Sequence, residues 1–105
     1  MLLRSEQIES FVKTKRDLAR KYDEWFCNTN YQFVNEPDSC ESNYWFNSFL
    51  ASDRQERDEI LEYTNSKNVM TRPSWTPMHE LDMFSDCQKD NLENTIWIEI
   101  GRAHV

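Results

Sequence analysis

The 105-residue chain contains a single glycine, Gly101, so residues 1–100 contain none. Glycine makes up about 7% of ordinary proteins and is the usual residue where a turn needs a positive φ angle. This composition is unusual for a complete domain with several strands and turns. The expected core is also thin, because Leu, Ile, Val and Phe supply only 22 of the 105 residues, although fourteen aromatic side chains add area that can be buried.

The last six residues, 100–105, read Ile-Gly-Arg-Ala-His-Val and look like the translation of a common sequencing-library adapter. We therefore expect the natural sequence to lie within residues 1–99 and residues 100–105 to be an artefact. The alternative is an ordinary helix end with Gly101 as its C-cap. In either case Arg102 and His104 carry no functional weight.

The chain is acidic, with 19 Asp and Glu against 12 Lys and Arg and a net charge of −7. Phosphate backbones and anionic lipids repel such a chain, so neither a nucleic acid nor a membrane is an expected partner. Cys27, Cys40 and Cys87 form no CxxC pair, which argues against a disulfide framework or a zinc site and suits a reducing cytoplasm. The N-terminus lacks the apolar run of a signal peptide.

Hydrophobic periodicity predicts helices and short strands of an α+β fold with a small antiparallel sheet. A long amphipathic helix is expected over residues 5–26, with Ser5 and Ser10 as possible caps. A second helix is expected from a capping box at residues 52–55 to Asn65, and a third from Asp90 to Trp97. The expected strands are residues 31–34, 42–50 and 69–72. The apolar stripe of the first helix is broad, so its partner is either its own domain or another domain or subunit.

No local catalytic signature is present: the chain has no P-loop, GxSxG or HExxH motif. Without the C-terminal hexapeptide His79 is the sole histidine, so no multi-histidine metal site is expected. Asp82, Asp86 and Asp90 lack the spacing of a calcium loop and are interpreted as solvated carboxylates. A Cys–His nucleophile and base is possible in principle, but Cys27 and Cys87 are better explained as ordinary buried thiols.

Residues 72–79 are the most informative segment because they combine Arg72, Trp75 and His79 with two prolines. An arginine fork binds phosphate or carboxylate, a histidine donates to sugar or phosphate oxygens, and an indole stacks on a ring. The alternative is structural: Arg72 pairs with an acidic side chain while Trp75 and Met78 fill a gap in the core. The residues alone leave both interpretations open.

Four segments, in the same order, resemble the C-terminal domain of the DegT/DnrJ/StrS sugar aminotransferases. They are residues 6–22, 42–47, 56–65 and 70–79, and the string Thr-Arg-Pro-Ser-Trp-Thr-Pro-Met-His at 71–79 is the most specific. Residues 83–92 add to the likeness, which covers about residues 6–98. The branch that makes legionaminic-acid-type nucleotide sugars looks most similar.

This resemblance implies the small domain of a fold-type-I, pyridoxal-phosphate-dependent homodimer. Such an enzyme transfers an amino group, with glutamate the expected donor, to a keto nucleotide sugar in surface-polysaccharide or nonulosonic acid biosynthesis. It implies that Arg72, Trp75 and His79 contact the sugar nucleotide and that the long helix joins the two domains.

In the family the Schiff-base lysine and the acid that pairs with the pyridine nitrogen belong to the large domain. No lysine of this chain matches the motif around that lysine, so we expect no catalytic or cofactor-binding residue here and no activity from this chain alone. The alternative is a stand-alone acidic α+β module that docks a partner through its aromatic helix face.

Overall fold

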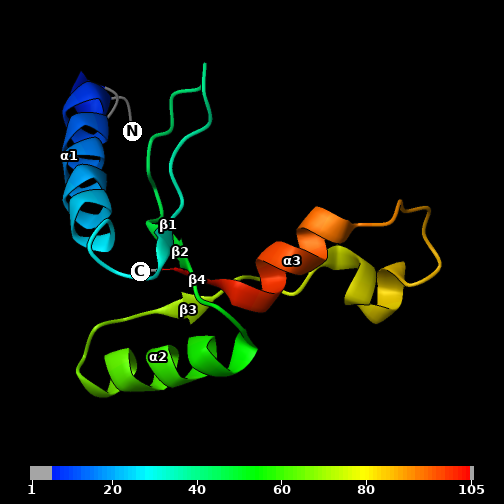
Figure 1. Cartoon of the computed structure of the whole chain (residues 1–105). Coiled ribbons are helices and arrows are strands. Elements are labelled where there is room, and N and C mark those ends of the chain that lie inside the picture. Colours follow the sequence, from blue (N-terminus) through cyan, green and yellow to red (C-terminus); the bar gives the residue numbers. More distant parts are fainter. Residues whose placement is uncertain (1–5, 105) are drawn as a thin grey trace. The chain divides into compact units, whose positions relative to one another are not determined.

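The computed structural model describes residues 6–104, and for residues 100–104 the backbone only. The chain forms two compact units, Met1–Asn47 and Ser48–Val105 (Figure 1). The first unit contains helix α1 (Ile8–Phe26) and strand β1 (Gln32–Phe33). The second contains β2 (Ser48–Leu50), α2 (Arg54–Ser66), β3 (Arg72–Pro73), the 3-10 turns Met78–Glu80 and Asp82–Phe84, α3 (Glu93–Gly101) and β4 (Arg102–His104). Helices and a small antiparallel sheet confirm the α+β class.

Helix α1 ends at Phe26 as predicted but begins three residues later than expected. Of the two possible caps, Ser5 lies outside the described residues and Ser10 lies inside the helix. Gln7, at the N-cap position, makes no capping hydrogen bond through its side chain. The apolar residues of α1 lie on two adjacent faces of the helix, one buried and one exposed. Ala19 and Phe26 are buried in the unit, whereas Ile8, Phe11, Leu18 and Trp25 are exposed.

Aromatic rings hold the first unit together. Phe26, at the end of α1, stacks on Phe33 of β1 with ring centroids 5.8 Å apart, and Phe33 stacks in turn on Tyr44 at 6.4 Å. Phe26 and Phe33 are both buried. The strand predicted at residues 31–34 is confirmed in place but is only two residues long.

The continuous strand predicted over residues 42–50 is wrong, because only Ser48–Leu50 is extended in a sheet. The Ser42 hydroxyl accepts a hydrogen bond from the Tyr44 N–H at 3.0 Å, and the Asn43 side chain accepts one from the Trp45 N–H, also at 3.0 Å. Such local bonds offer the backbone an alternative to a sheet ladder. Trp45, in the middle of the predicted strand, is 68% exposed.

Positive φ angles occur here without glycine. Ser39, Tyr44, Asn68 and Leu92 have φ values of 66°, 46°, 61° and 54°. Asparagine tolerates this region because its short amide bonds locally, whereas an apolar residue such as Leu92 is strained there by about 1–2 kcal/mol. The glycine-poor sequence therefore still makes tight turns, at a cost in backbone strain.

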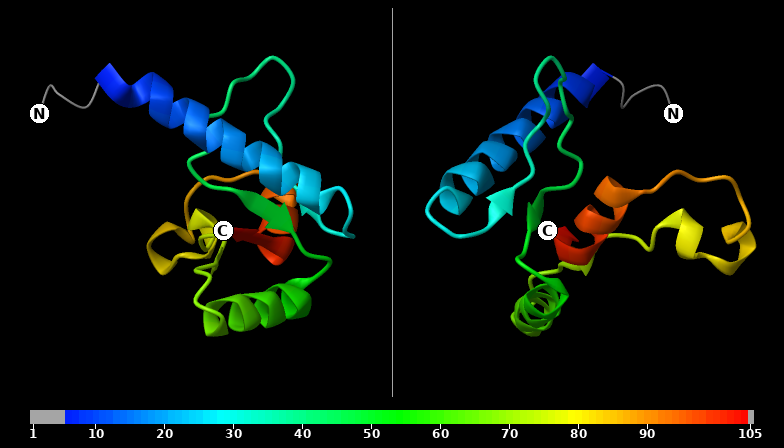
Figure 2. Two further views of the ribbon diagram at one scale, coloured as in Figure 1. Left: turned by 90° about the vertical axis from the view of Figure 1, so that its left-hand side faces the viewer. Right: turned by 45° about the vertical axis from the view of Figure 1, so that its right-hand side comes forward.

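Strand β4 lies between β2 and β3 and is antiparallel to both (Figure 2). Ser48 and Arg72 each lie opposite His104, and Pro73 lies opposite Ala103. The predicted antiparallel sheet is confirmed, although the predicted strand at residues 69–72 is reduced to Arg72–Pro73. The backbone pairing of residues 102–104 does not test where those residues come from, so the adapter interpretation stays a prediction.

The N-cap residue of α2 is Asp53, one residue after Ser52, where the predicted capping box begins. The Asp53 carboxylate, not Ser52, accepts the hydrogen bond of a helix N-cap, from the Glu56 N–H at 2.8 Å. Glu56 reaches back to accept a bond from the Ser52 N–H at 2.7 Å, which completes a reciprocal pair of the kind that starts helices. Ile60 and Leu61 of α2 are half-buried, whereas Tyr63 is exposed.

Helix α3 begins at Glu93, three residues later than the predicted start at Asp90. The Asp90 carboxylate instead accepts a hydrogen bond from the Leu92 N–H, two residues ahead, at 2.8 Å. The helix continues to Gly101, beyond the predicted end at Trp97. Among the described residues, no helix combines the length and the apolar character needed to cross a bilayer.

Candidate functional site

The end of α2 fixes the point where the segment of residues 72–79 begins. Thr71, directly before Arg72, is buried. The Asn65 side-chain amide donates to the Thr71 carbonyl at 3.1 Å and to its hydroxyl at 3.0 Å, and the Thr64 hydroxyl lies 2.5 Å from the same hydroxyl. These bonds tie one helix end to one strand, so the backbone that carries Arg72 leaves from a firmly held position.

The three predicted ligand residues lie at successive points of this segment. Arg72 is exposed on β3, Trp75 is 73% exposed after it, and His79 is half-buried in the first 3-10 turn. The structural alternative is not supported: Trp75 and Met78 are exposed and fill no core gap. Arg72 forms no ion pair with an acid within the described part of the chain.

A cavity of about 570 Å³ lies beside His79 in the second unit, within the usual size range of small-molecule sites. Arg72 and Trp75 are not among the residues that line it. Apolar and hydrogen-bonding side chains from the 3-10 turns, the following loop and the start of α3 form its wall: Met78, His79, Phe84, Cys87, Gln88, Lys89, Asp90, Leu92 and Thr95. The wall therefore combines apolar side chains with a few that can form hydrogen bonds.

Sequence reasoning missed Gln88, Lys89 and Thr95 as wall residues. No motif marks them, and they meet His79 only because the chain turns back after the 3-10 turns. The one available signal was the likeness of residues 83–92 to the aminotransferases, which named no individual side chain. A cavity made by such a turn is not visible in residue spacing.

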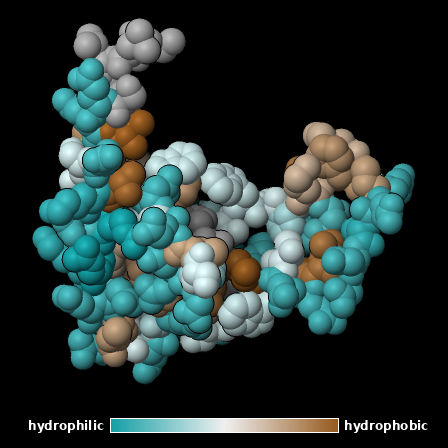
Figure 3. Space-filling model, turned by 90° about the horizontal axis from the view of Figure 1, so that it is seen from above, coloured by the Kyte–Doolittle hydropathy of each residue, from teal (hydrophilic) through white to brown (hydrophobic). Residues whose placement is uncertain are grey.

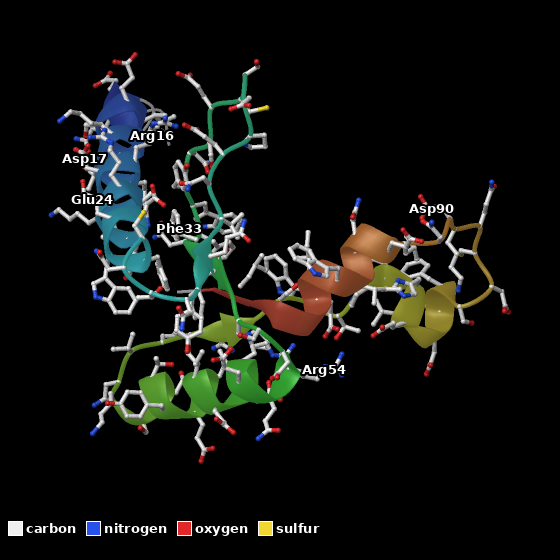
Figure 4. All side chains as sticks on the ribbon, viewed as in Figure 1. Arg16, Asp17, Glu24, Phe33, Arg54 and Asp90 are labelled. Atoms are coloured by element: carbon white, nitrogen blue, oxygen red, sulfur yellow. The ribbon has the colours of Figure 1, made fainter. Side chains whose placement is uncertain are left out.

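The charged side chains Lys89 and Asp90, which line this cavity, form hydrogen bonds within the chain. The Lys89 ammonium donates to the Ser85 carbonyl at 3.3 Å, and Asp90 is occupied by the Leu92 N–H. Figure 4 shows Asp90 on the loop that leads into α3. His79 Nε2 lies 3.9 Å from Glu80 Oε1, a contact that becomes an ion pair when the imidazole is protonated. The wall thus offers hydrogen-bond donors without a concentration of one charge.

The cysteine interpretation needs correction. Cys27 and Cys87 are free and exposed, not buried thiols. Cys87 and His79 line the same cavity, but no hydrogen bond joins them within residues 6–99. Nothing therefore arranges the thiol and the imidazole as a nucleophile and its base.

The described residues fit neither a metal nor pyridoxal phosphate. No group of three or more His, Cys, Asp or Glu side chains in the described ranges could hold a metal ion. A Schiff-base lysine is normally activated by desolvation or by a neighbouring cation, and the cofactor ring needs an acid at its nitrogen. Lys89, the lysine of the cavity wall, is exposed and bonded to a carbonyl, and its neighbour Asp90 binds the backbone.

A second polar cluster lies in the first unit. Arg16 and Glu36 form a two-pronged ion pair with N–O distances of 2.7 and 2.8 Å, and Ser42 binds both partners through its carbonyl and its N–H. Figure 4 shows Arg16 on the side of α1 that faces this loop, with Asp17 and Glu24 on the other side. The Arg16 hydrogen bonds and the Ser42 N–H lower the pKa of Glu36 to about 2.

This cluster borders a cavity of about 240 Å³. Its principal charges satisfy one another, because each carboxylate oxygen of Glu36 accepts a hydrogen bond from Arg16. The cluster therefore fastens the loop to α1 and leaves no charge free for a ligand.

Two curated relatives with similar sequences are GDP-perosamine synthases. The GDP-perosamine synthase of Escherichia coli O157:H7 is 31% identical over 85 residues, which are 81% of this chain and 23% of that protein. The GDP-perosamine synthase of Vibrio cholerae is 26% identical over 81 residues, 75% of this chain and 22% of that protein. The chain thus spans less than a quarter of the length of these relatives.

Solved structures share the fold. The putative sugar aminotransferase Spr1654 from Streptococcus pneumoniae, in its PLP form, matches 99% of this chain and 28% of its own with a TM-score of 0.86 at 14% identity. The aminotransferase TlmJ from Streptoalloteichus hindustanus matches 95% of this chain and 27% of its own with a TM-score of 0.82 at 18% identity. The model of the DegT/DnrJ/EryC1/StrS aminotransferase family matches residues 2–101. Because that match takes in nearly the whole sequence, the chain belongs to the DegT/DnrJ/EryC1/StrS aminotransferase family.

Proposed function

We propose that this chain is the small domain of a pyridoxal-phosphate-dependent enzyme that transfers an amino group from glutamate to a keto nucleotide sugar. The family match over residues 2–101 is the observation that carries the proposal, and the two relatives named GDP-perosamine synthase support the substrate class. The parent enzyme works as a cytoplasmic homodimer in surface-polysaccharide or nonulosonic acid biosynthesis.

Arg72, Trp75 and His79 contact the nucleotide sugar in this proposal. Arg72 carries a guanidinium fork that suits a phosphate, and the held position of Thr71 limits the conformational entropy lost on binding. The exposed indole of Trp75 offers a face for a ring. His79, in the wall of the larger cavity, donates to a sugar or phosphate oxygen.

The chain alone does not transaminate in this proposal. When bound, pyridoxal phosphate supplies the electron sink for amino transfer, and it needs a lysine anchor and an acid partner. Because the described residues do not fit either role, both come from a part of the subunit outside this sequence. The isolated chain should show no Schiff-base absorbance and no turnover.

The proposal extends to the sugar and to the nucleotide that carries it. The legionaminic-acid-type branch stays a prediction, because the two curated relatives are GDP-perosamine synthases. We therefore propose assaying keto sugars carried on GDP and on UDP side by side, with glutamate as the donor.

The test uses the complete subunit expressed from its full reading frame. Arg72→Ala should lower kcat/KM for the nucleotide sugar by about 10- to 100-fold, the usual loss for one charge-assisted contact. Arg54→Ala is the matched control, because Arg54 lies in the same unit and pairs with Glu99 at 2.7 Å. Equal effects of the two variants would refute the role of Arg72. A complete subunit that moves no amino group to any keto nucleotide sugar would refute the function.

We also propose that the natural domain lies within residues 1–99 and that residues 100–105 derive from an adapter. A long read of the source DNA across both ends tests this directly. Continuation upstream into a lysine-bearing domain, and downstream into a different hexapeptide, is the expected result. A clean start and a stop codon after Val105 would instead support the acidic interaction module.

A further inference from the structure

The wall of the larger cavity contains polar side chains whose hydrogen-bonding groups are unused. The Gln88 amide and the Thr95 hydroxyl line the cavity, and neither side chain forms a hydrogen bond within the described part of the chain. By contrast, the amide of Gln55 on α2 donates to Glu59 at 2.9 Å. The two groups of the cavity wall are therefore free to bind a ligand.

The charges of the wall favour an uncharged part of a ligand. Lys89 and Asp90 offset each other in charge, both bind backbone groups, and Arg72 does not line the cavity. A diphosphate binds best to free cationic donors, so it is not expected inside. At the right of Figure 3, where the 3-10 turns and the following loop lie, hydrophobic and hydrophilic side chains meet at the surface. The apolar part of the wall comes from Met78, Phe84 and Leu92.

A nucleobase has the chemistry that this wall matches. Its two faces pack on apolar or aromatic side chains, and its edge carries hydrogen-bond donors and acceptors. The half-buried Phe84 supplies an aromatic ring in the wall. The Gln88 amide offers a donor and an acceptor side by side, and the Thr95 hydroxyl can act as either.

We propose that the cavity beside His79 binds the base of the nucleotide that carries the sugar. The inference rests on the proposed function and assigns one end of that substrate to this cavity. The sugar must bring its reacting carbon to the cofactor, and the charged side chains of the wall fit neither the lysine anchor nor the acid partner that the cofactor needs. The sugar end therefore points to the rest of the subunit, and the base enters the cavity.

The test compares Gln88→Ala with the wild type in the complete holoenzyme. The ligands are GDP and UDP, which lack the sugar, and calorimetry measures their affinity. Gln88→Ala should weaken the better-bound nucleotide about tenfold, the loss expected for one or two neutral hydrogen bonds. The KM for the nucleotide sugar should rise by a similar factor with kcat unchanged, because a contact to the base is the same in the ground state and the transition state.

Gln55→Ala is the matched control, because it makes the same change in the same unit, at an amide that is paired with Glu59 and lies outside the cavity. It should change neither the nucleotide affinity nor KM. Equal effects of the two variants would overturn the proposal.

The remaining outcomes separate the base from the sugar and the cavity from the function. The nucleotide that binds more tightly identifies the base. A lower kcat of Gln88→Ala with unchanged nucleotide affinity would place the sugar in the cavity and overturn the proposal, as would a wild-type subunit that binds neither nucleotide. Nucleotide binding that depends on Gln88 in a subunit without amino transfer would refute the proposed function alone. Amino transfer with a nucleotide affinity that does not depend on Gln88 would refute the base site alone.

Discussion

Replacing Arg16 with Gln tests the cluster that fastens residues 36–44 to α1. Arg16 donates to both carboxylate oxygens of Glu36, at 2.7 and 2.8 Å, and to the Ser42 carbonyl at 2.6 Å. The Tyr44 ring lies below the guanidinium, 5.6 Å from its carbon, and the Tyr44 hydroxyl accepts the Glu36 N–H. One side chain thus connects three points of the loop.

The size of the effect follows from the pKa of Glu36. The Arg16 hydrogen bonds, followed by the Ser42 N–H, lower this pKa from 4.5 to about 2, which corresponds to a proton affinity about 300-fold weaker. Arg16→Gln removes the larger cause and leaves the Ser42 N–H in place. The pKa of Glu36 should therefore rise most of the way back toward 4.5.

The pH dependence of stability has a definite sign. Because the folded state holds Glu36 at a lower pKa than the unfolded chain, the contribution is present above about pH 4.5. It is lost as the pH falls from there toward 2. Partial exposure of both side chains lets solvent screen the pair and reduces the effect on stability.

Carboxyl ¹³C NMR titration measures the pKa of Glu36, and urea midpoints at pH 7 and pH 3 measure the consequence. Arg20→Gln is the matched control: the same charge is lost from the same helix, but Arg20 pairs with Asp17 at 2.9 Å and is largely exposed. Wild type and Arg20→Gln should lose more stability than Arg16→Gln between these pH values. A wild-type Glu36 that titrates near 4.5, or a control that behaves like Arg16→Gln, would contradict the reasoning.

Two further substitutions test packing. Phe26→Ala removes a buried ring stacked on Phe33 and should lower the free energy of unfolding, measured with urea, by about 3 kcal/mol. Trp25→Ala, at the exposed neighbouring position, should lower it much less. Equal losses would refute the assigned faces of α1. Thr71→Val keeps the side-chain shape but leaves the Asn65 amide without the hydroxyl it binds. The free energy of unfolding should fall by about 1–2 kcal/mol. An unchanged urea midpoint would show that this hydrogen bond does not hold the start of β3 in place.

The helices were predictable because their signals are local. Apolar spacing placed α1 to its final residue and α2 to within two residues at either end. The strand over residues 42–50 was not predictable from its aromatic content, because Ser42 and Asn43 bind the backbone two residues ahead. Similarly, hydrophobic periodicity identifies the apolar positions of α1 but does not say which of them are buried in the core and which are exposed.

Of the residues that line the larger cavity, the sequence singled out His79 as a ligand-binding candidate, and that role stays a prediction. The string at residues 71–79 pointed to Arg72, Trp75 and His79, and the structure gives the start of that string a firm attachment to α2. The cavity beside His79 depends on a wall that includes Thr95, sixteen residues further along. The cavity forms only because the loop between these residues folds back, and neither the composition nor the residue spacing predicts that fold.

Leu92 connects that loop to the cavity and shows why the turn forms at this place. Its φ of 54° is unfavourable for a branched apolar residue, and such strain persists where surrounding contacts hold it. Asp90 binds its N–H, its carbonyl accepts the Ile96 N–H at the start of α3, and its side chain lines the cavity. The strained residue therefore sets the direction in which α3 begins, and with it the position of Thr95 in the cavity wall. A glycine would relieve the strain, but it would also remove an apolar side chain from the cavity wall.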